Sequence, residues 1–282
     1  MTTTITLPDG RKLGFAEYGR PKGSPVLFCH GTPGSRLTIT DGMSRLADAM
    51  DIWLIVPDRP GYGESDPKPN RRFIDWPEDV SVLLKKLEIN RFRALGYSMG
   101  SPYALACAYM MPESVSGISL VGGLSPNLFD PEVVATISPT SNALFTMARD
   151  NPTLLIETLK TLAPDGDSLL AAMAGGFPAA DKALLAQAQI TSTFLRDSIE
   201  TLHQGHDEAA TDFILTANSW GFDLKAIQAP THIWNGLEDL NVPPAMARYL
   251  ASNLPRNKIC LLPDEGHLCL FPHWEEILAE IS

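Results

Sequence analysis

The sequence predicts an α/β fold, in which a mostly parallel central sheet of about eight strands is flanked by helices and carries an inserted helical cap. Short apolar runs recur along the chain with amphipathic stretches between them, which is the pattern of buried parallel strands joined by helices. This alternation stops between about residues 124 and 228, where only helical patterns occur. Hydrophobic residues make up 44% of the 282 residues and charged residues 20%, so the chain can bury a sizeable core.

The predicted strands begin at the N-terminus. Two short strands flank a turn formed by Pro8, Asp9 and Gly10. Each later apolar run is typical of a buried strand. These runs cover residues 26–29, 52–56, 92–95, 115–121, 231–234 and 258–262.

Helices are predicted between these strands, at residues 44–50, 73–87, 99–111, 245–254 and 274–281. In the region without strands, a helix at 152–162 follows Asn151, which can cap its first turn, and starts at Pro152. We therefore expect an α/β core at residues 1–123 and 229–282 and a helical cap at residues 124–228. We do not expect the two parts to fold separately.

Charge and composition limit the partners. The chain carries 22 basic and 33 acidic residues, a formal charge of −11, which disfavours nucleic acids and anionic membranes. No apolar stretch approaches the roughly 18 residues of a membrane span, and the N-terminus lacks the pattern of a secretory signal. We therefore expect a soluble, cytoplasmic protein with a small-molecule partner. The four cysteines lie far apart in the sequence and are expected to be free thiols. The sequence does not predict the oligomeric state.

The sharpest motif is G-x-S-x-G at residues 96–100, between a predicted strand and a predicted helix. Such an abrupt turn brings backbones close together, which Gly96 and Gly100 tolerate. The turn leaves the central side chain, Ser98, standing clear and accessible to a substrate. A serine hydroxyl is a weak nucleophile, so it requires a nearby base that is itself oriented by an acid.

Residues of both kinds follow later strands. Asp239 lies on the loop after the strand at 231–234, and His267 lies on the loop after the strand at 258–262. Ligands of open α/β sheets bind at the carboxyl ends of strands, where these loops meet. Glu238 and Asp264 are close alternatives to Asp239 as the acid. The order serine, acid, histidine is that of a nucleophile-elbow enzyme.

Acyl transfer also requires donors for a negatively charged oxygen, usually peptide N–H groups. The first expected donor is Met99, at the N-terminus of the helix after Ser98. The second is expected in the loop His30-Gly31-Thr32-Pro33-Gly34-Ser35, after the strand at 26–29. Proline has no N–H group, so Thr32 is the best candidate there.

With these motifs the chain resembles the α/β-hydrolase superfamily over nearly its whole length outside the helical insertion. The resemblance rests on His30-Gly31-Thr32-Pro33, the segment 58–65 (DRPGYGES), the motif at 96–100, Gly236-Leu237-Glu238-Asp239 and Gly266-His267. It implies the α/β-hydrolase fold, an architectural role for 58–65 including Arg59, and a cap that roofs the site. It also implies Gly31, Trp220 and Phe222 as candidate substrate contacts.

The expected activity is that of a serine esterase acting on small carboxylic esters, with Ser98 as nucleophile, His267 as base, Asp239 as acid, and Thr32 and Met99 at the oxyanion. No cofactor and no metal are expected, since the close histidine pair, His203 and His206, encloses a glycine and has no cysteine nearby. Three alternatives stay open. They are a carbon–carbon bond hydrolase, a pathway thioesterase or methyl esterase, and a ligand-sensing receptor of the same fold.

Overall fold

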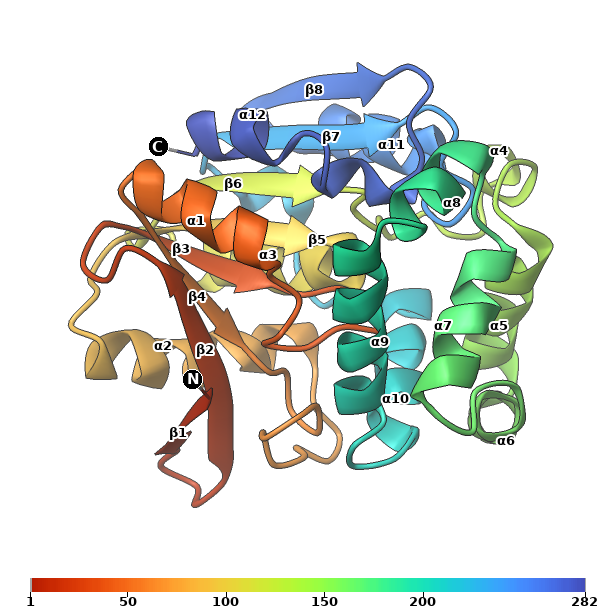
Figure 1. Ribbon diagram of the computed structural model, residues 1–282, viewed down its shortest axis with the longest axis horizontal. Coiled ribbons are helices and arrows are strands. Elements are labelled where there is room, and N and C mark those ends of the chain that lie inside the picture. Colours follow the sequence, from red (N-terminus) through yellow and green to blue (C-terminus); the bar gives the residue numbers. More distant parts are fainter. Residues whose placement is uncertain (1, 282) are drawn as a thin grey trace.

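The computed structural model describes residues 2–281, in which one eight-stranded sheet has the order β1-β2-β4-β3-β5-β6-β7-β8 (Figure 1). The strands β2–β4 and β1–β2 pair antiparallel, and all pairs from β4 to β8 are parallel. The mostly parallel sheet predicted from the sequence is confirmed. The strands are β1 Thr2–Thr6, β2 Lys12–Gly19, β3 Ser24–Cys29, β4 Ile52–Pro57, β5 Phe92–Tyr97, β6 Val115–Val121, β7 Thr231–Gly236 and β8 Asn257–Leu262.

Helices cover both faces of this sheet. On one face, α1 (Asp41–Ala49) and α12 (Trp274–Ala279) pack on a core that includes Phe28 and Leu54. On the other face lie α2 (Trp76–Lys86), α3 (Ser101–Met110) and α11 (Pro244–Asn253). Every residue of β4 is buried, as expected of a central strand covered on both sides.

Residues 124–228, which we call the helical segment, contain no strand among the residues that the structure describes. In Figure 1 they lie beyond the carboxyl ends of β5, β6 and β7. Asn151 caps α6 by accepting a hydrogen bond from the Leu154 peptide nitrogen, as predicted. The helices are α4 Pro131–Val134, α5 Pro139–Asp150, α6 Pro152–Leu162, α7 Gly166–Gly175, α8 Ala179–Leu185, α9 Ala188–Thr201 and α10 Asp207–Ala217.

Some helix boundaries differ from the sequence prediction. Helix α1 starts at Asp41, three residues before the predicted start at 44, because the Thr40 side chain caps it by accepting from the Met43 peptide nitrogen. Four short 3₁₀ turns also occur within residues 2–281: η1 Phe73–Asp75, η2 Ser98–Gly100, η3 Leu224–Ala226 and η4 His267–Leu270. The outermost positions of the predicted core, 1 and 282, lie outside the described residues.

The cysteines are free thiols, as predicted; Cys29, Cys107 and Cys269 are buried and Cys260 is half-buried. None of the helices within residues 2–281 combines the length and the apolar composition that a membrane span requires.

Candidate active site

Ser98 occupies the sharp turn between β5 and α3. Its φ of 52° lies in the left-handed region, which is strained for a residue other than glycine. A Cβ at Gly100 would lie 1.9 Å from the Cys29 carbonyl oxygen, and one at Gly96 would lie 2.6 Å from Ser101 Cα. Only glycine at both positions therefore permits this turn.

Ser98 is buried, with only 8% of its surface exposed. The sequence predicts an accessible serine, because the turn alone leaves the side chain standing clear. The serine is therefore not exposed to open solvent as predicted. Residues of the helical segment line the cavity onto which Ser98 opens. The serine is reached through this cavity.

Ser98, His267 and Asp239 form one hydrogen-bonded chain. His267 Nε2 lies 2.9 Å from Ser98 Oγ, and His267 Nδ1 lies 2.7 Å from Asp239 Oδ2. With the proton on Nδ1 donated to the carboxylate, Nε2 is free to accept the serine proton. Asp239 is itself fixed, because its other oxygen accepts hydrogen bonds from the peptide nitrogens of Asn241 and Val242.

The alternative acids do not join this chain. Glu238 and Asp264 are both exposed, whereas Asp239 is buried against His267. A buried carboxylate beside an imidazole stabilises its protonated form. Burial lowers the pKa of His267, but the charge and hydrogen bond of Asp239, together with the charge of Asp181, outweigh burial and raise it.

The loop after β3 lies beside Ser98. A Cβ at Gly31 would lie 3.4 Å from Ser98 Cβ, and Thr32 and Met99 line the same cavity as Ser98. Arg59, fully buried, donates hydrogen bonds to the carbonyl oxygens of His30 and Gly31. Arg59 therefore holds this loop in place, in keeping with the architectural role implied for residues 58–65.

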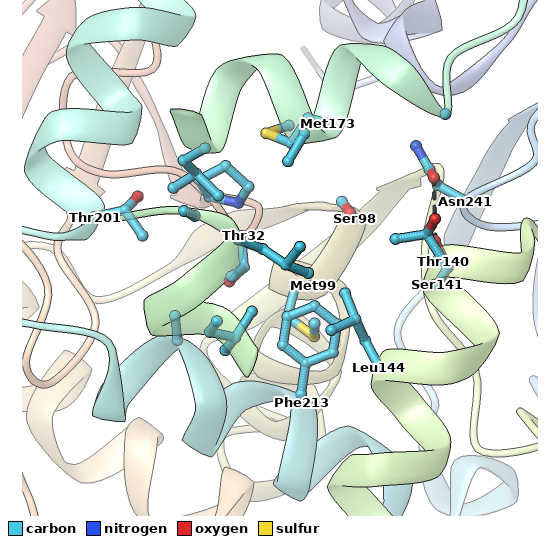
Figure 2. Close-up of a pocket in the computed structure, with 18 of the residues that line it drawn as sticks. Thr32, Ser98, Met99, Thr140, Ser141, Leu144, Met173, Thr201, Phe213 and Asn241 are labelled. Carbon is cyan, nitrogen blue, oxygen red and sulfur yellow. Dashed lines mark hydrogen bonds between the residues drawn. The ribbon is translucent and has the colours of Figure 1, made fainter. Parts of the chain in front are cut away.

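The cavity has a volume of about 160 Å³ and is lined by residues of the core and of the helical segment (Figure 2). Figure 2 shows Leu144, Phe213 and Met173 around the space that Ser98 faces. Thr140, Ser141 and Asn241 form a polar edge, in which the Ser141 hydroxyl donates to Asn241 Oδ1 at 3.2 Å. Among the lining residues in the described chain, none is Asp, Glu, Lys or Arg.

Trp220 and Phe222 do not line this cavity. Trp220 is buried in the core, where its ring packs against Phe73 and Phe222 and its Nε1 donates to the Thr216 carbonyl oxygen. Phe222 also packs against Tyr109 of α3. The expectation that they contact substrate is not supported, because the returning chain passes over α3 rather than over Ser98.

The sequence reasoning missed a buried carboxylate on α10, Asp212, which is completely inaccessible to solvent. Side chains from the core surround it and donate hydrogen bonds to it: Arg59, Arg71, Tyr62, Tyr103 and Thr32. Burial disfavours its charge, but the two arginines outweigh burial and lower its pKa.

Two further aspartates of the helical segment contact the loops that carry the site, and they were also missed. Asp197 on α9 accepts a hydrogen bond of 2.5 Å from Ser35, in the loop after β3. Asp181 on α8 accepts hydrogen bonds from the peptide nitrogens of His267 and Leu268. Their positions give no local sequence signal, because each meets residues far away along the chain.

Potential metal ligands do not gather in the part of the chain that the structure describes, where no group of three His, Cys, Asp or Glu side chains is arranged to hold an ion. His206 lies at the cavity wall and its Nε2 is 2.8 Å from the Ala163 carbonyl oxygen.

Known proteins share this fold and parts of this sequence. Residues 24–273 match the family model described as the alpha/beta hydrolase fold. A proline iminopeptidase from Xylella fastidiosa is 33% identical over 121 residues, a match that takes in 42% of this chain and 38% of that protein. The chain therefore aligns with only about two fifths of the length of that relative.

Two solved structures superpose over nearly the whole chain. A hydrolase from Pseudomonas aeruginosa has a TM-score of 0.75 at 18% identity, covering 99% of this chain and 97% of that one. An esterase from Exiguobacterium antarcticum has a TM-score of 0.73 at 21% identity, with the same coverage of 99% and 97%. Because the family model matches most of the length of this chain, the chain belongs to the alpha/beta hydrolase fold family.

Proposed function

We propose that the chain is a serine hydrolase that cleaves small, uncharged carboxylic esters without a cofactor. The observation that carries the proposal is the hydrogen-bonded path from Asp239 through His267 to Ser98, with distances of 2.7 and 2.9 Å, at an apolar cavity. In this proposal residues 1–123 and 229–282 form the catalytic core, and residues 124–228 form the cap that shapes the substrate site.

The reaction follows from the chemistry of such a path. Ser98 Oγ attacks the ester carbonyl carbon while His267 Nε2 takes the hydroxyl proton. Asp239 stabilises the resulting imidazolium, and the peptide N–H groups of Thr32 and Met99 bind the oxyanion. His267 then gives its proton to the leaving alcohol, and the acyl group stays on Ser98. Water, deprotonated by His267, attacks the acyl carbon, the bond between that carbon and Ser98 Oγ breaks, and His267 returns the proton to Ser98 Oγ as the acid leaves.

The cavity supports a substrate of limited size. An engineered cavity of about 150 Å³ in another protein holds one benzene molecule, so a cavity of this volume suits a group of about six non-hydrogen atoms. The volume here is about 160 Å³. We therefore expect preference for esters whose acyl or alcohol group has roughly that size.

The uncharged lining favours an ester over a peptide with a free amino terminus. A protonated amine removed from water needs a carboxylate partner. Within the described residues, no Asp or Glu lines the cavity. An activity like that named for the iminopeptidase relative is therefore the weaker candidate.

The test combines covalent labelling with substrate turnover. The protein is treated with a fluorophosphonate, the modified residue is mapped by mass spectrometry, and turnover is measured with p-nitrophenyl acetate, butyrate, hexanoate and octanoate. L-proline p-nitroanilide, a thioester and a β-diketone serve as competing substrates. We expect one label, on Ser98, and the highest kcat/KM with an ester of four to six acyl carbons.

Ser98→Ala should lose the label and lower kcat by at least about 10⁴-fold. Ser116→Ala is the matched control, since that hydroxyl donates to the Phe92 carbonyl oxygen on neighbouring β5 and does not line the cavity. Full activity in Ser98→Ala would contradict the proposal. Faster turnover of the amide, the thioester or the diketone would move the assignment to that reaction class. Absence of both labelling and turnover would favour a ligand-binding function.

A further inference from the structure

Helix α8 contacts the turn that carries His267 through one carboxylate. Asp181 Oδ2 accepts a hydrogen bond of 2.8 Å from the His267 peptide nitrogen, and Oδ1 accepts one of 2.9 Å from the Leu268 peptide nitrogen. Both carboxylate oxygens are therefore committed to the backbone of a single turn, η4. The side chain does not contact Ser98 and takes no part in the proton path described above.

This contact supplies what the turn cannot supply for itself. The first peptide N–H groups of a helical turn have no partner within it, and a side chain at the capping position usually accepts them. In η4 the capping position is Gly266, which has no side chain. Asp181 takes over that role from a position 86 residues earlier in the sequence.

Gly266 leaves room for the Asp181 carboxylate, because it has no side chain. A Cβ at Gly266 would lie 2.4 Å from Asp181 Oδ2 and 2.5 Å from Oδ1, so any other residue would displace the carboxylate. Asp181 is completely buried. The charges that act on its pKa are those of His267 and Asp239. Burial of such a group is costly, and here two charge-assisted hydrogen bonds to the His267 turn offset the cost.

The Asp181 carboxylate also contributes to the negative charge around His267. The titratable groups that face the imidazole are Asp239 after β7, Asp181 on α8 and Tyr97 at the end of β5, whose ring stacks on it at 5.5 Å. Burial lowers the pKa of His267, and the charges of Asp239 and then Asp181 raise it. Removing one negative charge should therefore lower that pKa.

We propose that Asp181 is a positioning residue for His267, through which the helical segment holds the turn of the base in register with Ser98. The proposal rests on the function proposed above. It assigns the helical segment a part in the reaction beyond enclosing the substrate: the base is correctly placed only while α8 is docked. Displacement of α8 would release the His267 turn and interrupt the proton path.

The test is Asp181→Asn in the full chain. The amide offers one acceptor, and its N–H₂ group would face a peptide N–H. A shift of about 1 Å in a catalytic group can cost about a hundredfold in rate, so we expect kcat to fall by about ten- to a hundredfold with KM within about twofold. We also expect the acid limb of kcat/KM to move to lower pH. Asp165→Asn is the matched control, because exposed Asp165 caps only its own helix by accepting from the Ser168 peptide nitrogen.

Two further measurements separate positioning from misfolding. An NMR titration of the histidine signals gives the pKa of His267 directly, whether or not the protein turns over esters, and should show a lower value in Asp181→Asn. Gly266→Ala keeps both carboxylates but pushes Asp181 away, so it should lower kcat with a smaller change in the acid limb. This second variant answers the question if Asp181→Asn does not fold.

The outcomes are distinguishable. If the wild type labels at Ser98 and Asp181→Asn behaves like Asp165→Asn in kcat and in the pKa of His267, the positioning role is wrong and the esterase proposal stands. If the wild type neither labels nor turns over any ester, the proposed function fails, and the role of Asp181 fails with it because there is no base to position.

Discussion

The hydroxyl of Thr32 donates a hydrogen bond of 3.0 Å to the carboxylate of Asp212, which lies 180 residues later in the sequence. Thr32 belongs to the loop beside Ser98, and Asp212 belongs to helix α10. The loop that faces the candidate nucleophile is therefore hydrogen-bonded directly to the helical segment. Arg59 strengthens this connection, because its guanidinium contacts both the Thr32 hydroxyl, at 2.6 Å, and Asp212, at 2.8 Å.

Asp212→Asn is expected to destabilise the protein strongly. The substitution leaves the buried guanidinium groups of Arg59 and Arg71 without a full counter-charge, and breaking a buried ion pair from one side typically costs about 3–5 kcal/mol. Urea unfolding at pH 7 gives the change in the free energy of unfolding. The same exposed control, Asp165→Asn, should change it by less than about 1 kcal/mol. A loss for Asp212→Asn as small as that of the control would show that the network contributes little.

Much of the candidate site could be predicted because its residues have local signals. Ser98 lies in a glycine-flanked turn between a strand and a helix, and Asp239 and His267 each follow a strand that is a short apolar run. Parallel strands end at the same edge of a sheet, so three local patterns were sufficient to bring these side chains together. The same reasoning predicted the strands from their short apolar runs. The expectation that the run at 258–262 is a buried strand is wrong, because β8 lies at the edge of the sheet, where Lys258 and Ile259 are exposed.

The carboxylates of the helical segment could not be predicted in this way. Asp181 and Asp212 lie in helices with no distinctive pattern, and their partners are 86 and 180 residues away for the contacts with His267 and Thr32. Their roles depend on how the segment packs on the core, which periodicity does not specify. The same lack of information explains why Trp220 and Phe222 were expected at the cavity rather than in the core.

The pH dependence of turnover should follow His267. The imidazole must be neutral to accept the Ser98 proton, and its pKa is raised by Asp239 and Asp181 against the effect of burial. We therefore expect kcat/KM to fall on the acid side of a midpoint that is raised from the ordinary pKa of histidine. Asp239→Asn should lower kcat by about 10⁴-fold and move this midpoint to lower pH. Stopped-flow or steady-state ester hydrolysis between pH 5 and 9 measures both effects, and an acid limb unaffected by Asp239→Asn would assign the titration to another group.

Chain-length preference should change when the cavity is enlarged. Phe213 lines the cavity and packs against Phe145 at a ring distance of 5.1 Å. Phe213→Ala should raise the ratio of octanoate to butyrate kcat/KM by about tenfold, because burying two or more additional methylene groups gains about 0.8 kcal/mol each. Phe222→Ala is the control, since it removes a similar ring outside the cavity and should lower stability without changing the ratio. An equal change in both variants would mean that the effect does not come from the cavity.

Asp197 should make the protein less stable as the pH rises from about 4 to about 7. Burial raises its pKa to about 7, with hydrogen bonds from Ser35 and Thr38 and the charge of Arg196 acting in the opposite direction. A carboxyl whose pKa is higher in the folded state binds its proton more tightly there than in the unfolded chain. Its contribution to stability is therefore fully present below the unfolded pKa of about 4 and is lost between there and about pH 7.

Asp197→Asn removes this titration while keeping an oxygen that accepts from Ser35. The free energy of unfolding, measured with urea at pH 5 and pH 8, should fall between these values in the wild type by on the order of 1–3 kcal/mol more than in the variant. The variant should consequently be the more stable protein at pH 8. Exposed Asp167→Asn serves as the control and should show the wild-type slope. Parallel pH dependence in Asp197→Asn and the wild type would mean that Asp197 is already ionised at pH 5 and that Ser35, Thr38 and Arg196 outweigh its burial.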